Sequence, residues 1–465
     1  MEKKTMMIIA AIVAIAIIAA AAVLLLNNNG SHDTDESGKM VGKSLKESEF
    51  PASDSRLWVY GNANEDDRMD QSDVTALQNM VDGKRAKTQL ADANADGTVD
   101  SKDVEYLKKI LAATSSTKMD VYYVDNYFKV AKVSWPVKTI ATSYCSGFYT
   151  AETTGLTQKI AMVDSTINTY WSKLNSYAAS AEVYGSTETP DYESMIKKKI
   201  SVYVPGYCDS TADEQSLSKL NPAGIDVMFL NTCDNSGVDI TNEYIDRSII
   251  MFGYLLQGDM DLTYKYLQWH DKIVSTVETA ASKLTESQKG ALVMSRQSPF
   301  YTTTGQYSLT GKGNTNMIHA DWAGCYVIAD HEPLLPKNYN SLPVETILTI
   351  LKNAYDAGHS TVYWIDNEHD GLRGQYDLDK TVATWEETLT EAVPEMHYLG
   401  MAREAGNSPL YVLEMVFYMN VMHPGLISLD FEDEFDYWVE NFTLETSKYT
   451  ANMDIDNFFK DFGTA

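Results

Sequence analysis

The strongest constraint on the fold is a long helical pattern that interrupts an alternation of strands and helices. Residues 242–284 contain no proline, and Gly258 marks the point at which this helix would divide into two pieces. On both sides of it, short apolar runs alternate with helical segments. Because such alternation is typical of parallel α/β layers, the sequence predicts an α/β fold in which a long helix separates two α/β halves, called lobes below.

The strands of the two lobes are predicted from these short apolar runs. They lie at residues 138–142, 160–163, 200–204, 226–230, 290–295, 360–365 and 395–401. The amino-terminal lobe is therefore predicted at residues 118–240, the interlobe helix at 241–286 and the carboxyl-terminal lobe at 287–465. The four cysteines have no metal-binding spacing, so buried free thiols are expected, with a Cys208–Cys233 disulfide as the alternative for that pair.

A smaller module, residues 57–113, contains an internal repeat. The segment "NANEDDRMDQSDVTALQNMV" begins at Asn62, and "DANADGTVDSKDVEYLKKIL" begins thirty residues later, at Asp92. Each copy is an acidic loop followed by an amphipathic helix, with apolar side chains at i, i+3 and i+7. The sequence therefore predicts a small all-α module of two EF-hand-like repeats.

The two loops have the composition of calcium sites, because Ca²⁺ binds oxygen atoms supplied from loop positions 1, 3, 5, 7, 9 and 12. The predicted ligands in the second loop are Asp92, Asn94, Asp96, the Thr98 carbonyl, Asp100 and Asp103. The predicted ligands in the first loop are Asn62, Asn64, Asp66, the Arg68 carbonyl, Asp70 and Asp73. Position 6 is Gly97 in the second loop and Asp67 in the first, which predicts a weaker first site. The alternative is a pair of solvated acidic turns.

The amino terminus predicts a membrane anchor. Lys3 and Lys4 precede an uncharged apolar run at residues 6–26, which as a helix would span about 30 Å. The lysines place the rest of the chain on the extracytoplasmic side of the cell membrane. A cleaved signal peptide is the alternative. Residues 27–56 are polar and predict a flexible linker. The formal net charge of −28 excludes nucleic acid as a partner.

The repeated loops and helices resemble the dockerin type I module over residues 58–113. In that family, loop positions 10 and 11 help to select a cohesin partner. Here these positions are Gln71 and Ser72 in the first loop, and Ser101 and Lys102 in the second. The resemblance implies calcium as a cofactor and a cohesin-like surface protein as a partner. A structural calcium module that serves only as a spacer is the alternative.

The two-lobed region resembles the substrate-binding proteins of ABC importers for iron-siderophores, haem and cobalamin. The resemblance covers nearly all of residues 118–465 and rests on phrases that occur in the family's order. They are "VKTIATSY", "TPDYESMIKKKISVYV", "LNPAGIDVMFLN", "MFGYLLQGDMDLTYKYLQWHDKIVSTV", "SLPVETILTILKNAYDAGHSTVYWI" and "VFYMNVMHPGLISLDFEDEFDYWVENF". The family implies two Rossmann-like lobes joined by a long helix, the class III arrangement, with the ligand bound between the lobes.

This resemblance implies two kinds of functional residue. Glu193 in "PDYES" and Glu345 in "LPVET" match the acidic residues that dock on the permease; their alternative role is to stabilise a helix amino terminus. Ligand contacts are expected on loops that follow strands, where aromatic and charged groups suit a flat anionic chelate. The candidates are Tyr144, Cys145, Tyr149, Arg296, Tyr301, Tyr307, Trp322, Trp364 and Asp366. The run Asp366, Glu368, His369 and Asp370 is either a metal site or a solvated turn.

Three functions are compatible with these patterns. The first is a membrane-anchored solute-binding protein, without enzymatic activity, that captures an iron or cobalt chelate and delivers it to an ABC importer. The second is a dockerin-bearing cell-surface enzyme, although no pair of catalytic carboxylates stands out. The third is a scaffold or adhesion protein that binds no small ligand.

Overall fold

The computed structural model describes most of the chain after residue 36. The described residues are 37–52, 54–170, 176–205, 210–230, 242–296, 305–359, 361–367, 383, 387–389, 392–393, 395–406, 408–443 and 455–464. No helix in these segments is long and apolar enough to cross a membrane. The predicted anchor at residues 1–26 lies outside them.

The amino-terminal lobe is built on a parallel sheet of five strands, in the order β5-β4-β3-β6-β7. The strands are β3 (Ile140–Thr142), β4 (Ile160–Val163), β5 (Glu182–Val183), β6 (Val202–Val204) and β7 (Asp226–Val227). The helices of this lobe are α4 (Tyr144–Thr153), α5 (Ser165–Tyr170), α6 (Ser176–Ser180), α7 (Tyr192–Lys198) and α8 (Ser210–Leu220). Every strand of the sheet runs in the same direction, as the alternation of strands and helices predicted.

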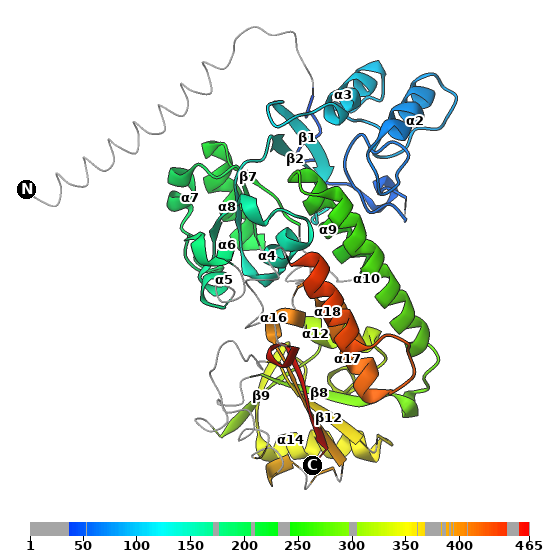
Figure 1. Ribbon diagram of the computed structural model, residues 1–465, viewed down its shortest axis with the longest axis vertical. Helices are drawn as coiled ribbons and strands as arrows, with labels where there is room; N and C mark the ends of the chain where they lie inside the picture. The colour runs from blue at the N-terminus through cyan, green and yellow to red at the C-terminus, as the bar shows by residue number, and fades with distance from the viewer. Residues whose placement is uncertain are drawn as a thin grey trace, which may run out of the picture.

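Two helices connect the lobes, α9 (Asn242–Leu255) and α10 (Met260–Ala281) (Figure 1). The break falls at Gly258, as predicted, and its cause is a close approach of the backbone. A Cβ atom at Gly258 would lie 2.3 Å from the carbonyl oxygen of Thr154, which follows α4. The amide of Asp259 donates to that same oxygen, and the Asp259 side chain accepts from Leu262 N to begin α10.

The carboxyl-terminal lobe contains a mixed sheet in the order β11-β9-β8-β12-β13-β14, with β10 also paired to β8. Its strands are β8 (Ala291–Arg296), β9 (Gln306–Thr310), β10 (Tyr326–Val327), β11 (Tyr339–Pro343), β12 (Thr361–Asp366), β13 (Glu395–Met401) and β14 (Phe459–Thr464). Strands β8, β10, β12 and β13 are parallel, whereas β9, β11 and β14 are antiparallel to their neighbours. This lobe is therefore less regular than the parallel layer that the sequence predicted.

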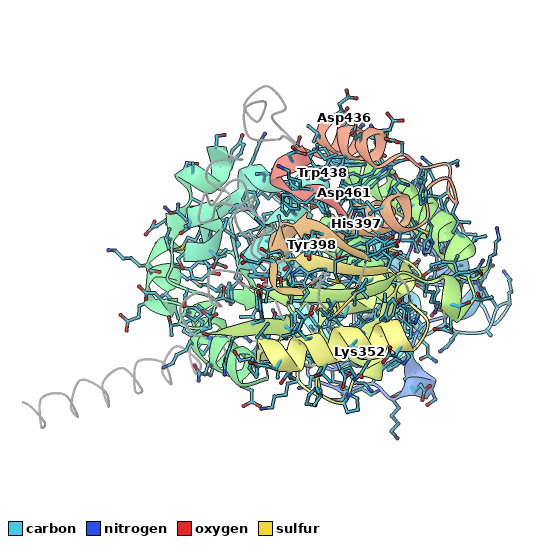
Figure 2. All side chains as sticks on the ribbon, turned by 90° about the horizontal axis from the view of Figure 1, so that it is seen from below. Lys352, His397, Tyr398, Asp436, Trp438 and Asp461 are labelled. Atoms are coloured by element: carbon cyan, nitrogen blue, oxygen red, sulfur yellow. The ribbon has the colours of Figure 1, made fainter. Side chains whose placement is uncertain are left out.

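Helices cover both faces of this second sheet. They are α12 (Thr315–Trp322), α13 (Ile328–His331), α14 (Val344–Asp356), α16 (Arg403–Gly406), α17 (Tyr411–Met422) and α18 (Phe431–Phe442). Figure 2 shows Lys352 of α14 and Trp438 of α18 on opposite sides of the strands that carry His397 and Tyr398. Trp438 also contacts Tyr149 of α4, with ring centroids 5.7 Å apart, so α18 packs against the amino-terminal lobe as well.

The small module consists of α2 (Gln71–Val81) and α3 (Ser101–Leu111), each preceded by its acidic loop. Beside it lies an antiparallel hairpin of β1 (Met119–Val124) and β2 (Val130–Trp135). This hairpin pairs with neither large sheet, although its residues fall within the range predicted for the amino-terminal lobe.

The second half of the predicted flexible linker is ordered, which corrects the prediction for residues 37–52. The amides of Gly42 and Leu45 donate to carbonyl oxygens of the hairpin, and Phe50 stacks on Phe128 with ring centroids 4.5 Å apart. The apolar side chains in this polar segment bury surface against the hairpin, which a linker of uniformly polar composition would not do.

Candidate functional site

The two acidic loops share one hydrogen-bond pattern. In the first loop, the Asp73 carboxylate accepts from Asn64 N at 3.1 Å and Asp70 N at 2.8 Å. In the second loop, the Asp103 carboxylate accepts from the equivalent amides, Asn94 N at 3.1 Å and Asp100 N at 2.8 Å. Position 4 has a positive φ in both loops. The repeat seen in the sequence is therefore a repeat of backbone structure, with the predicted ligand positions grouped in each loop.

The loops differ at position 1 and in burial. Asp92 accepts from Asp96 N and Gly97 N, whereas the side-chain amide of Asn62 donates to Leu57 O and Asp66 O. The Asn62 Oδ1 atom is buried without a hydrogen-bond partner, as expected of an oxygen placed to bind a cation. Burial raises the pKa of Asp73 to about 6 and that of Asp103 to about 7. Oxygen ligands of this kind fit Ca²⁺.

In the amino-terminal lobe, the carboxyl ends of β3 and β4 meet at a buried carboxylate. Asp164 accepts hydrogen bonds from Tyr144 N, from Thr166 N at 2.6 Å, from Ile167 N at 3.0 Å and from the Thr187 hydroxyl at 3.0 Å. Burial raises the pKa of Asp164. Tyr144 is held there with φ of 61°, a left-handed conformation that is costly for a bulky residue. Such strain is typical of functional positions, and Asp164 is the residue that fixes it.

The structure places the predicted ligand residues of the amino-terminal lobe on a helix, which corrects the predicted loop. Tyr144, Cys145 and Tyr149 all belong to α4, which begins directly after Ser143. Tyr144 is half-buried, whereas Cys145 and Tyr149 are buried. Cys145 and Cys325 are both buried and neither forms a disulfide with another described residue, while Cys208 and Cys233 lie outside the described residues.

In the carboxyl-terminal lobe, the predicted candidates are mostly interior. Tyr307 lies within β9 rather than on a loop, and its ring packs edge-on against Trp364 at 5.5 Å. Trp364 and Asp366 are fully buried on β12. Trp322 ends α12 and is half-buried against His319. The Arg296 side chain, Tyr301 and residues 368–370 lie outside the described residues. The ligand contacts of the whole set remain predictions.

The end of β12 carries a polar residue that was not among the predicted site residues. Asn367 follows Asp366, and its amide donates to Ser295 O at the end of β8. Its side-chain Oδ1 is buried and has no hydrogen-bond partner. Buried acceptors of this kind are normally satisfied by water, an ion or a ligand. A polar residue directly after a buried strand was the available signal, and the same signal would have found Asp164.

Glu193 and Glu345 occupy equivalent positions on their helices. Each is exposed in the first turn, Glu193 on α7 and Glu345 on α14. Both positions leave the carboxylate accessible to a partner, and both also favour the helix dipole. The structure therefore leaves both predicted roles available.

A surface groove of about 1200 Å³ lies elsewhere. Lys138, Ser201 and Asp226 contribute to its lining, at the amino-terminal ends of β3, β6 and β7. Ligands of open α/β sheets bind at the carboxyl ends of strands. This groove is therefore at the wrong end of the sheet for the predicted solute site.

Known structures share this architecture at low sequence identity. No protein-family model and no curated protein sequence matches the chain. The TroA-like periplasmic binding protein FepB from Veillonella parvula matches with a TM-score of 0.54 and 13% identity, over 74% of this chain and 99% of that one. The molybdate periplasmic binding protein MolA of a Haemophilus influenzae ABC transporter matches with a TM-score of 0.53 and 12% identity, over 69% of this chain and 97% of that one.

A third structure, an ABC transporter solute-binding protein from Sulfurospirillum deleyianum, matches with a TM-score of 0.51 and 10% identity, over 69% of this chain and 94% of that one. The chain therefore has the fold of periplasmic solute-binding proteins, in agreement with the fold that the sequence predicted.

Proposed function

We propose that this protein binds a metal chelate between its two α/β lobes and delivers it to an ABC importer. The observation that carries the proposal is the two-lobed architecture, in which α9 and α10 join two sheets and which is shared with periplasmic solute-binding proteins. In such folds the ligand meets the carboxyl ends of strands, where the strained Tyr144 and the buried Asp164 and Asn367 lie.

The chemical class of the solute follows from the predicted site. Half-buried aromatic rings such as Tyr144 and Trp322 suit a flat or conjugated ligand, and Arg296 suits an anionic one. Haem, with its flat ring and two propionates, satisfies both requirements, and an iron-siderophore or cobalamin is a further candidate. Glu193 and Glu345, exposed on the two lobes, are the proposed contacts with the permease.

The other parts of the chain have supporting roles in this proposal. The apolar segment at residues 6–26 anchors the protein, with its bulk on the extracytoplasmic side. The repeated loops bind calcium and stabilise the module. A cohesin-like surface protein is the proposed partner of the module. The residues that would contact it, Gln71, Ser72, Ser101 and Lys102, are all exposed.

Isothermal titration calorimetry of the full-length chain in mild detergent tests the proposed function. Ferric siderophores, haem, cobalamin and molybdate are titrated separately, and saturable one-to-one binding of at least one chelate is expected. Trp322→Phe should weaken that binding, whereas Trp58→Phe in the small module should not. The proposal fails if no chelate binds while the protein remains folded by circular dichroism.

A further inference from the structure

The residue that departs from the calcium-loop pattern in the first loop has a structural task. Asp67 stands at position 6, where the second loop has Gly97. Its carboxylate accepts from Arg56 N at 3.1 Å and Arg56 Nε at 2.7 Å, and Arg56 Nη2 lies 2.6 Å away. The first loop thus holds a guanidinium group in a fixed orientation.

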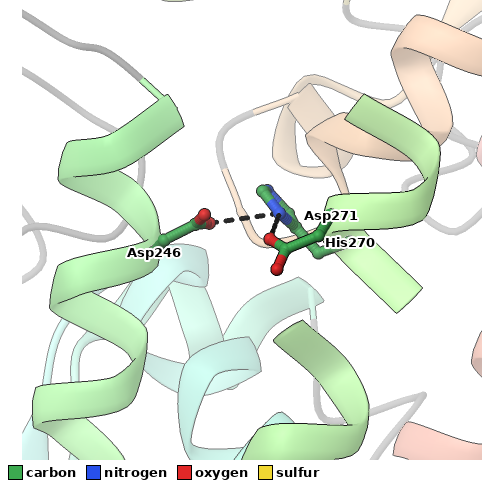
Figure 3. Close-up of side chains that lie close together, drawn as sticks. All are labelled: Asp246, His270 and Asp271. Atoms are coloured by element: carbon green, nitrogen blue, oxygen red, sulfur yellow. Dashed lines mark hydrogen bonds and ion pairs between the residues drawn. The ribbon is translucent and has the colours of Figure 1, made fainter. Parts of the chain in front are cut away.

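That guanidinium group reaches both interlobe helices. Arg56 Nη1 lies 3.3 Å from the Asp246 carboxylate on α9 and 3.0 Å from the Asp271 carboxylate on α10. His270 lies between the two acids, with its Nδ1 atom 3.1 Å from Asp246 Oδ1 and 3.5 Å from Asp271 Oδ1 (Figure 3). The three side chains alone resemble a metal site, but Arg56 supplies the cation.

Burial affects the charged side chains at this contact, and Asp246 most of all. Desolvation raises the pKa of the nearly buried Asp246 to about 6, against the opposing effect of His270 and Arg56. The Arg56 side chain is itself only 22% exposed. Removing Arg56 would leave the carboxylate of Asp246, whose side chain is only 9% exposed, without its arginine partner, which is unfavourable.

Further contacts tie the same loop to α10. The Tyr264 hydroxyl donates to the carbonyl of Asp67 at 2.8 Å, and the guanidinium of Arg68 lies 4.1 Å from the centre of the Tyr264 ring. Asp67 stands between two predicted calcium ligands, Asp66 and the Arg68 carbonyl. The backbone segment that would close around the ion is therefore the segment that contacts the interlobe helices.

We propose that the first loop acts as a calcium-dependent strut on the interlobe helices. Calcium holds Asp66, Asp70 and Asp73 together against their mutual repulsion, and so fixes Asp67 and Arg56 on α9 and α10. Loss of calcium loosens the loop and releases that contact. The inference rests on the calcium binding proposed above, but it is independent of which solute the lobes bind.

Hydrogen–deuterium exchange of the full-length chain tests the strut. Exchange of backbone amides in α9 and α10 is measured in millimolar calcium and in excess chelator. For the unmodified chain, chelation should accelerate exchange in these helices by about 5- to 30-fold. In Arg56→Met the helices should exchange at the faster rate in both conditions, while the amides of α3 still respond to calcium.

Two further variants complete the test, one as a control and one that weakens the contact from the helix side. Arg85→Met removes an exposed arginine of the same module and should behave as the unmodified chain does. Asp271→Asn weakens the contact from the helix side without altering a calcium loop, and should reproduce the effect of Arg56→Met in part.

The outcomes separate the possible failures. The strut is refuted if α9 and α10 ignore calcium while α3 responds, or if Arg56→Met keeps the calcium dependence of these helices. If no amide of the module responds to calcium, the calcium proposal fails and the strut fails with it. Neither result affects solute binding by the lobes, which calorimetry measures separately.

Discussion

The break between the interlobe helices provides a sharp test of the packing described above. Alanine at Gly258 would place its Cβ atom 2.3 Å from the Thr154 carbonyl oxygen, 3.0 Å from Leu156 Cγ and 3.2 Å from the Gly253 carbonyl oxygen. The first of these atoms belongs to the backbone, so it cannot move aside by a change of rotamer. The two chain segments must separate.

The expected cost combines three effects. Overpacking of a close contact costs about 1–3 kcal/mol. Separation also weakens the hydrogen bond from Asp259 N to Thr154 O, which is 2.8 Å long and contributes about 0.5–1.5 kcal/mol. The lower entropy of the unfolded alanine chain offsets about 0.4–1 kcal/mol. Gly258→Ala should therefore destabilise the protein by about 2 kcal/mol, within a range of about 0.5–4 kcal/mol.

Urea unfolding followed by tryptophan fluorescence measures this loss. Gly83→Ala is the control for steric overlap, because an alanine Cβ atom at Gly83 would have no heavy atom within 4 Å. Gly83 has a φ of 71°, so the cost of this control should be limited to backbone strain, about 1–2 kcal/mol. A Gly258→Ala protein within about 0.5 kcal/mol of the unmodified chain would show that the close approach to Thr154 does not constrain the fold.

Other substitutions test the remaining parts of the molecule. Asp103→Asn should reduce the calcium-induced rise in melting temperature, and an unchanged rise would count against the second calcium site. The pKa of Asp125 is raised by burial to about 6, so its stabilising effect is present below pH 4 and is lost as the pH rises through 6. Asp125→Asn should therefore gain up to about 3 kcal/mol relative to the unmodified chain between pH 4 and 7 in urea unfolding; a constant difference would contradict this. Trp438→Ala should cost about 3–5 kcal/mol in the same assay, and a loss below about 1 kcal/mol would refute its place in the core. Glu193→Gln combined with Glu345→Gln should abolish solute uptake in cells without changing solute affinity, and normal uptake would remove the docking role.

Local periodicity was sufficient to predict the main architecture. The strands at residues 160–163 and 395–401 have the predicted bounds, and the helix break falls at Gly258. These features depend on short-range patterns of apolar residues and glycine. The antiparallel strands β9, β11 and β14 were not predicted, because "QYSLT", "YNSLP" and "FKDFGT" lack the continuous apolar runs from which the other strands were inferred.

The candidate site was harder to predict. Tyr307 and Trp364 are aromatic residues near the predicted site in sequence, but they pack against each other in the core. An aromatic side chain serves a core as well as a ligand, so its type alone cannot separate the two. Asp164 was missed because the phrase that contains it, "KIAMVDSTI", was matched to the family only as a strand, although an acidic residue directly after a buried strand was visible there.

The contact between the small module and the interlobe helices could not be predicted from the sequence. Arg56 and Asp271 are 215 positions apart, and no local pattern links them. Asp67 could be recognised only as a departure from the calcium loop. The structure supplies the physical reason for that departure, because a glycine at this position would offer Arg56 no carboxylate.

The ordered segment at residues 37–52 limits how far the protein can reach. Since this segment folds onto the hairpin, only residues 27–36 separate the proposed anchor from the folded body. Ten residues span at most about 35 Å when fully extended. The anchored protein would therefore search only a thin layer above the membrane for both solute and transporter. A short tether of this kind keeps the effective concentration of the binding protein near membrane-embedded importers high.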